Sequence, residues 1–176
     1  MPIEIGILKL IHILCLVYWL GADSGVFYSS YYLVNEKLSR DTRINVSKIL
    51  FFLDQAPRIS MILIFPSGIH LAKSLGYINI SYSMVISIWL IAISWLILVC
   101  VLHIKGQAVK KLALFDYWLR IMFVLGMSYV FLNIVINQPE YIWAGKKILA
   151  FTITVICGLI IRKKLRLFEP AFVSLI

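Results

Sequence analysis

The first long apolar run, residues 3–34, most constrains what this chain can fold into. At about 1.5 Å per residue, a helix over this run is longer than the roughly 30 Å hydrocarbon core of a bilayer. The run nevertheless carries His12 and Asp23. Polar and ionisable groups are costly at membrane depth, so we expect these side chains to face the interior of a helix bundle and to mark a functional site.

Four further apolar runs follow the first. With 62% hydrophobic residues and a mean hydropathy of +0.96 over 176 residues, the composition is that of an integral membrane protein. The runs lack the alternation of a transmembrane barrel, and the first is too long for a cleaved signal peptide. The sequence therefore predicts an all-α, polytopic membrane helix bundle, a single domain over 1–176. Its five transmembrane helices are expected at 3–34, 51–75, 80–104, 115–137 and 141–162.

The net charge of +9 is distributed unevenly between the two ends of these runs. If the N-terminus is outside, thirteen of the 17 Lys and Arg residues lie at the inner ends and four at the outer ends. The four are Lys9, Lys73, Lys146 and Lys147. This bias predicts an N-out, C-in topology and a cytoplasmic loop at 35–48. We expect the excess charge to face anionic lipid head groups rather than nucleic acid.

Two pairs of ionisable residues are placed at matching levels on the first two expected helices. In an antiparallel pair, residues at equal depth have a constant index sum. His12 with His70, and Asp23 with Arg58, have nearly equal sums, which predicts level pairs to within about 1.5 Å. On the second helix, Pro66 lies between Arg58 and His70. We expect this proline to break or kink the helix.

Each level pair has two interpretations. His12 and His70 are either axial ligands to the iron of a haem held between the helices, or two histidines that form separate hydrogen bonds inside the bundle. Arg58 pairs either with Asp23 across the helices or with Asp54 four residues earlier on its own helix. The sequence alone leaves both questions open, because it does not show how the helices face each other.

The remaining candidate residues lie further along the chain. His103, at the inner end of the third helix, is a candidate with Asp23 and Arg58 for proton handling or for contact with substrate carboxylates. Asp116 and Arg120 are spaced for a local ion pair. Two sets of residues complete the candidates. Asn133 and Asn137, at the outer end of the fourth helix, are expected near the histidines, and Cys15, Cys100 and Cys157 are expected to be buried thiols without a disulfide.

One stretch of the first helix, "HILCLVYWLG" from His12 to Gly21, resembles the first helix of the HemJ-type protoporphyrinogen oxidases and the related CopD-like membrane proteins. The second helix with Pro66 and Gly68, and the third helix ending at His103, are loosely similar to that group. The resemblance implies a small bacterial inner-membrane helix bundle that binds haem b, with His12 as a candidate ligand.

These observations support three hypotheses for the function. The first is a haem b-binding redox protein of the bacterial inner membrane, an oxidoreductase acting on a porphyrinogen or quinone with an electron-transfer partner. The second is a permease for a small solute or copper, although the chain lacks clusters of methionine and cysteine. The third is a non-catalytic assembly subunit of a membrane complex. A homo-oligomer is compatible with each, and the motifs of soluble enzymes are missing from the sequence.

Overall fold

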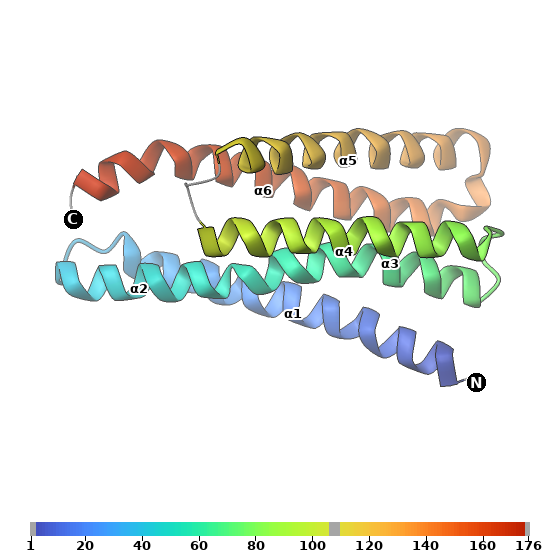
Figure 1. Ribbon diagram of the computed structural model, residues 1–176, viewed down its shortest axis with the longest axis horizontal. Helices are drawn as coiled ribbons and strands as arrows, with labels where there is room; N and C mark the ends of the chain where they lie inside the picture. Colours follow the sequence, from blue (N-terminus) through green and yellow to red (C-terminus); the bar gives the residue numbers. More distant parts are fainter. Residues whose placement is uncertain (1–2, 106–109, 175–176) are drawn as a thin grey trace. The chain divides into compact units, whose positions relative to one another are not determined.

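The computed structural model describes residues 3–105 and 110–174, with side chains described up to residue 160. All of the regular elements in these ranges are helical (Figure 1). In chain order they are α1 (Ile3–Leu33), α2 (Arg40–Leu53), α3 (Gln55–Ser74), α4 (Tyr82–Lys105), α5 (Lys110–Asn137), the short 3-10 helix η2 (Pro139–Tyr141) and α6 (Ile142–Ser174). The all-α prediction is confirmed.

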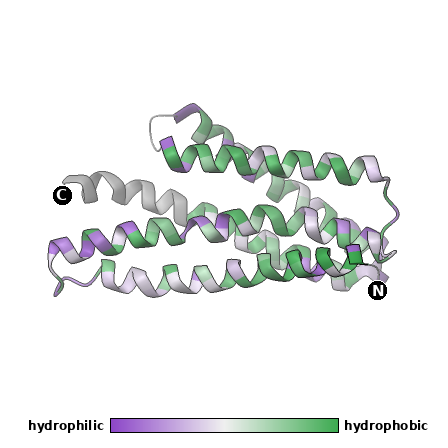
Figure 2. Cartoon of the chain, turned by 60° about the horizontal axis from the view of Figure 1, so that its bottom comes forward, coloured by the Kyte–Doolittle hydropathy of each residue, from purple (hydrophilic) through white to green (hydrophobic). Residues whose placement is uncertain are grey.

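Within the described residues, five helical segments are long and apolar enough to cross a membrane, as predicted. They are Ile3–Leu33, Arg40–Ser74, Tyr82–Lys105, Lys110–Asn137 and Pro139–Ile160. Only 17–22% of the residues in their most apolar windows are buried, so most of their apolar side chains face outward. Figure 2 shows hydrophobic colouring along the middle of the helices and hydrophilic colouring near the connections. This pattern suits helices that are surrounded by lipid.

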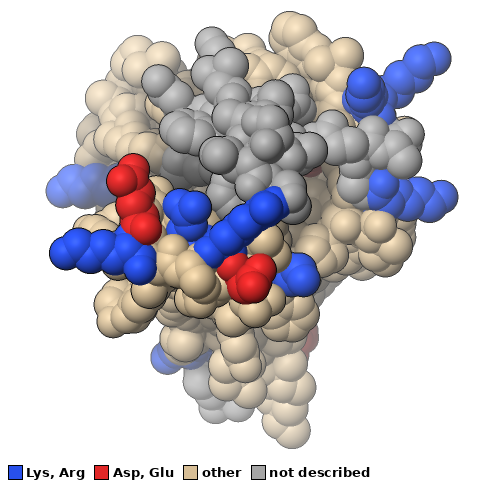
Figure 3. All heavy atoms as spheres, turned by 90° about the vertical axis from the view of Figure 1, so that its left-hand side faces the viewer, with Lys and Arg blue, Asp and Glu red and all other residues tan. Residues whose placement is uncertain are grey.

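The polar segment at 35–48 is largely helical, which corrects the prediction of a loop. Helix α2 starts at Arg40, and the Ser39 side chain caps it by accepting a hydrogen bond from the Thr42 backbone N–H at 3.2 Å. Only Asp54 separates α2 from α3. Viewed from the side of the α1–α2 connection, basic side chains are spread around this end, with a few acidic ones among them (Figure 3). The basic side chains at 162–166 lie outside the described residues.

The chain divides into two compact units, residues 1–106 and 107–176. In the first unit, α1 packs on α2 and α3, and α3 also packs on α4. The contact face of α1 contains the buried residues Leu8, Cys15 and Trp19, whose spacing places them on one side of the helix with His12. On the other face of α3, Ile62 packs against Ala92 and Val99 of α4. Helix α3 therefore forms the centre of this unit.

Helix α3 continues through Pro66, so the predicted break is wrong, while the alternative of a kink there stays a prediction. Proline has no backbone N–H, so the carbonyl oxygen of Ile62 loses its usual helical donor. Pro66 and Ser67 are both fully buried, which means that neighbouring residues hold this part of the helix in place.

In the second unit, α5 and α6 form a helical hairpin joined through η2. Gly145 of α6 lies against Ile134 of α5, because a Cβ at Gly145 would be only 3.2 Å from Ile134 Cγ2. Further along the same interface, the rings of Phe123 and Phe151 meet edge to face with centroids 5.8 Å apart. A glycine at the closed end of the hairpin thus allows close approach of the two helices.

Candidate functional site

His12 is held at the α1–α3 interface by a hydrogen bond and by a close packing contact. Its Nδ1 lies 3.0 Å from Ser67 Oγ. The Ser67 hydroxyl has one hydrogen, which it donates to the Ile64 carbonyl oxygen at 3.0 Å. That arrangement leaves Ser67 Oγ as an acceptor and corresponds to the His12 tautomer with its hydrogen on Nδ1, although the 3.0 Å contact is equally compatible with the other tautomer.

Gly68 provides the space that the His12 ring occupies. A Cβ built on Gly68 would be 3.0 Å from His12 Cε1 and 3.5 Å from its Nδ1. The imidazole thus lies directly over the α3 backbone. A larger residue at position 68 would require the ring or the α3 backbone to shift, so Ser67 and Gly68 together fix the position of the His12 ring.

His70 interacts with a different residue of α1. Its Nε2 lies 3.5 Å from Glu4 Oε1, whereas His12 is opposite Ser67 and Gly68. His70 is three residues beyond Ser67, which is about 4.5 Å along the helix. The predicted level match between the two histidines is therefore off by about one turn. The structure places both on the same half of the α1–α3 pair without showing a contact between them.

Asp23 and Arg58, the second predicted pair, do not form an ion pair between the helices in the described part of the chain. Arg58 forms its salt bridge with Asp54, four residues earlier, so the interpretation as a pair within one segment is confirmed. Among the residues that the structure describes, no salt bridge joins Asp23 to Arg58. The Asp23 carboxylate instead accepts a hydrogen bond from the side chain of Trp19 and lies close enough to Asp54 for their charges to interact.

The other candidate residues are not brought to these groups. His103 is exposed near the end of α4, two residues before Lys105. Asn133 and Asn137 belong to the second unit, so their expected place near the histidines stays a prediction. Within the described residues, no group of three or more His, Cys, Asp or Glu side chains is placed to hold a metal ion. The three cysteines are free thiols; Cys15 is buried, but Cys100 and Cys157 are exposed, contrary to expectation.

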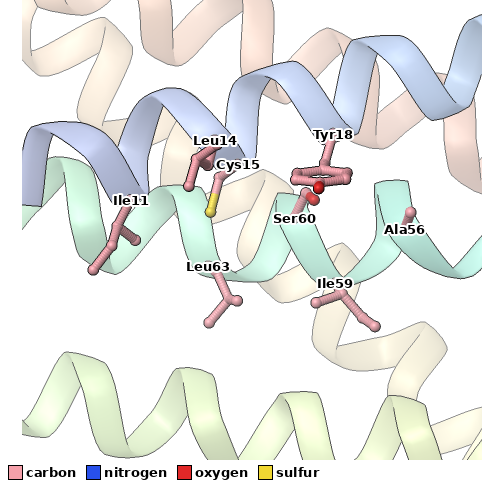
Figure 4. Close-up of a pocket in the computed structure, with 8 residues that line it drawn as sticks. All are labelled: Ile11, Leu14, Cys15, Tyr18, Ala56, Ile59, Ser60 and Leu63. Atoms are coloured by element: carbon pink, nitrogen blue, oxygen red, sulfur yellow. The ribbon is translucent and has the colours of Figure 1, made fainter.

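An apolar groove of about 350 Å³ runs along the α1–α3 interface (Figure 4). It lies between the His12–Ser67 contact and the side chains of Asp23 and Asp54. It begins beside Ile11, next to His12, and ends at Tyr18 and Ala56, near the level of Asp54 and Asp23. Its lining residues, four from each helix, are Ile11, Leu14, Cys15, Tyr18, Ala56, Ile59, Ser60 and Leu63. No feature of the sequence predicted this groove, because the way the two helices face each other determines which residues line it.

The most deeply buried ion pair lies in the second unit. Arg120 Nε donates to Asp116 Oδ2 at 3.0 Å, and the two residues are only 5% and 0% exposed. The spacing of four residues predicted the pair but made no prediction of its burial. The burial of this pair was missed because it depends on how neighbouring residues pack over the pair. The local sequence at the end of an apolar run does not show that packing.

Comparison with protein-family models, with curated proteins and with solved structures finds no match to this chain. The resemblance of the first helix to the HemJ-type and CopD-like proteins therefore stays a prediction, and the function has to be argued from the site itself.

Proposed function

We propose that this chain is a multi-pass protein of a bacterial inner membrane, with its N-terminus outside and its C-terminus inside. Five candidate spans support the multi-pass arrangement. The thirteen-to-four distribution of basic residues supports the orientation, because positive charge is retained on the cytoplasmic side. The α1–α2 connection, with Lys37 and Arg40, is then cytoplasmic. Helices α1 and α2–α3, with 31 and 35 residues, extend beyond the roughly 30 Å hydrocarbon core on that side.

Within this membrane bundle, we propose that His12 binds haem b and that the protein is a redox protein. The observation that carries this proposal is the His12 ring held between Ser67 and Gly68. In the tautomer that donates Nδ1–H to Ser67, Nε2 is the nitrogen that would ligate a metal. Histidine ligands in metalloproteins are commonly held in this way, through a hydrogen bond from the other ring nitrogen. Haem bound there would supply one-electron chemistry within the bilayer.

The residues around His12 have separate roles in this proposal. Ser67 orients the imidazole, and Gly68 leaves the space in which the ring lies. His70 is the second candidate ligand, on the same half of the α1–α3 pair but about one turn from the level of His12. The apolar groove beside His12 has room for part of an apolar substrate, which is in keeping with a quinone or porphyrinogen. Asp23, Arg58 and His103 are the candidates for proton exchange or for binding substrate carboxylates.

The test is the visible spectrum of the protein purified from membranes of cells supplied with haem, in oxidised and dithionite-reduced forms. We expect a Soret band with reduced α and β bands, which His12→Ala abolishes. His103→Ala is the matched control, because this histidine is exposed near the end of α4 and is expected to leave the spectrum unchanged. Loss of the bands in His70→Ala as well would indicate two histidine ligands, and retention would indicate His12 alone. A featureless wild-type spectrum would refute haem binding.

Ser67→Ala tests the orientation of the ring more finely. It removes the hydrogen bond at Nδ1 while keeping the His12 side chain, so we expect haem affinity to fall by roughly 10- to 100-fold, as for other supporting hydrogen bonds to metal ligands. Ser94→Ala is the control, since Ser94 is exposed on α4 and donates only to the Leu90 carbonyl oxygen of its own helix. Equal haem affinity in the two variants would contradict the role given to Ser67.

A further inference from the structure

The groove between α1 and α3 has two hydroxyl groups near one end and is otherwise lined by apolar side chains and one thiol. Its lining residues include no Lys, Arg, His, Asp or Glu. The only side-chain oxygens among them belong to Tyr18 of α1 and Ser60 of α3. Both residues lie toward the end of the groove at Ala56, away from Ile11 (Figure 4). Tyr18 and Ser60 are called the hydroxyl pair below.

The hydroxyl of Ser60 is buried and has no hydrogen-bond partner. Ser60 is only 6% exposed and lines the groove. Other serines of the long helices in this unit donate to a carbonyl oxygen of their own helix, as Ser67 and Ser94 do. Within the part of the chain that the structure describes, neither hydroxyl of the pair forms such a bond. An unpartnered hydroxyl in apolar surroundings is costly, so a hydrogen-bond acceptor placed at this end of the groove would be favoured.

The hydroxyl pair lies at hydrocarbon depth in the proposed orientation. Tyr18 follows Ile3, the first residue of α1, by 15 residues, and Ser60 precedes Ser74, the last residue of α3, by 14. At 1.5 Å per residue, both are about 21–23 Å from the outer ends of their helices. This is roughly 7–9 Å short of the inner edge of a 30 Å hydrocarbon core. An occupant of this end of the groove is therefore surrounded by acyl chains and reaches the groove from within the membrane.

Three classes of membrane-soluble molecule differ in what they would offer to the hydroxyl pair. A phospholipid has its ester oxygens at the level of the head groups, so its acyl chain carries no acceptor at this depth. A porphyrinogen carries ionised carboxylates, which require cationic partners that the lining of the groove lacks. A quinone carries neutral carbonyl oxygens on a ring that dissolves in hydrocarbon, together with an apolar isoprenoid tail. The groove volume of about 350 Å³ is at the lower end of the range for small-molecule sites, which suits one ring and the start of a tail.

We propose that the groove is a quinone-binding site in which the Tyr18 and Ser60 hydroxyls donate hydrogen bonds to a carbonyl oxygen of the quinone ring. The tail then lies along the apolar part of the groove toward Ile11 and continues into the hydrocarbon. The ring is six residues from His12, or about 9 Å along α1. This inference deepens the proposed function by naming a quinone rather than a porphyrinogen as the substrate. The redox role of the quinone rests on that function, whereas its binding does not require haem.

Equilibrium binding of a tritium-labelled benzoquinone with a decyl tail tests the proposal, using the full chain in lipid nanodiscs and subtracting the binding to empty nanodiscs. Ser60→Ala and Tyr18→Phe each remove one donor and keep the shape of the lining. We expect each to weaken binding roughly 2- to 10-fold, as for the loss of one neutral hydrogen bond. The matched controls are Ser94→Ala and Tyr129→Phe, at exposed positions on α4 and α5, which are expected to bind as the wild type does. Saturable binding that is unchanged in both Ser60→Ala and Tyr18→Phe, or no saturable binding to the wild type, would overturn the proposal.

Two unlabelled competitors separate a quinone site from a groove that takes another class of molecule. Decylbenzene has the same tail without carbonyl oxygens, so we expect it to displace the labelled quinone only weakly. Equal displacement by decylbenzene and by unlabelled quinone would indicate a groove for any apolar chain and would overturn the proposal. Displacement by a porphyrin dicarboxylate at a lower concentration than by the quinone would indicate a porphyrinogen site and would also overturn it.

The same binding measurement on His12→Ala distinguishes failure of this inference from failure of haem binding. His12 does not line the groove, so quinone affinity is expected to stay at the wild-type level in this variant, whatever its haem content. Wild-type quinone binding by a protein without haem would support the quinone site and leave the haem proposal to its own spectroscopic test. Loss of quinone binding in folded His12→Ala would contradict the position given to the ring.

Discussion

Replacing Gly68 with alanine is expected to destabilise the α1–α3 interface, because the new Cβ would be 3.0 Å from His12 Cε1. That separation is well below ordinary van der Waals contact, so either the His12 ring or the α3 backbone has to move. Inserting one methyl group into a packed site costs roughly 1–3 kcal/mol. Against this, alanine is favoured over glycine in a helix by about 0.5–1 kcal/mol. The expected net effect is a loss of up to about 2.5 kcal/mol.

The assay is unfolding of the detergent-solubilised protein, followed by the loss of helical signal with temperature or denaturant. Gly21→Ala is the matched control: Gly21 is also inside a long helix, but a Cβ there would meet nothing within 4 Å. We therefore expect Gly21→Ala to be neutral or slightly stabilising, and Gly68→Ala to unfold more easily and to lose the His12–Ser67 hydrogen bond. Equal stability of the two variants would refute the packing of His12 over Gly68.

Two further predictions concern the second unit. Gly145→Ala is expected to destabilise the α5–α6 hairpin by up to about 2.5 kcal/mol by the same balance, because its Cβ would be 3.2 Å from Ile134 Cγ2. Gly158→Ala has open space and is expected to be neutral. Unfolding in detergent compares the two, and a less stable Gly158 variant would contradict the hairpin packing. Asp116→Asn is expected to cost about 3–5 kcal/mol because it leaves the Arg120 charge buried without its carboxylate. The same assay checks it, and wild-type stability would show that the pair is not buried.

The number and type of the helices could be predicted because they depend on length and hydropathy alone. A run of about 20 apolar residues has few alternatives to a membrane helix. The exception was the segment at 35–48, whose charges suggested a loop. Its helix start was visible in retrospect, since Ser39 caps α2 and Asp41 lies in the first turn. The mixed charges of α2 fit a helix that extends past the bilayer.

The candidate residues were found by their chemistry, but their partners were not. His12 and Asp23 were conspicuous as polar residues in an apolar helix, whereas Ser67 and Gly68 are ordinary residues of a membrane helix. Which residue of α3 faces His12 depends on the rotation of α3 about its axis. Sums of residue numbers predict only depth and carry no information on that rotation. Depth matching was therefore off by about one turn for the histidines. The Asp54–Arg58 pair was predictable as one of two alternatives, because spacing by four residues is a local property.

The most direct test of the central claim is the haem content of the purified wild type and of His12→Ala, measured by extraction of the cofactor and compared with the protein concentration. The account predicts a single haem b per chain in the wild type and none in His12→Ala, with His103→Ala at the wild-type level. Equal haem content in His12→Ala and the wild type, or no haem in a folded wild-type protein from haem-supplied cells, would contradict it.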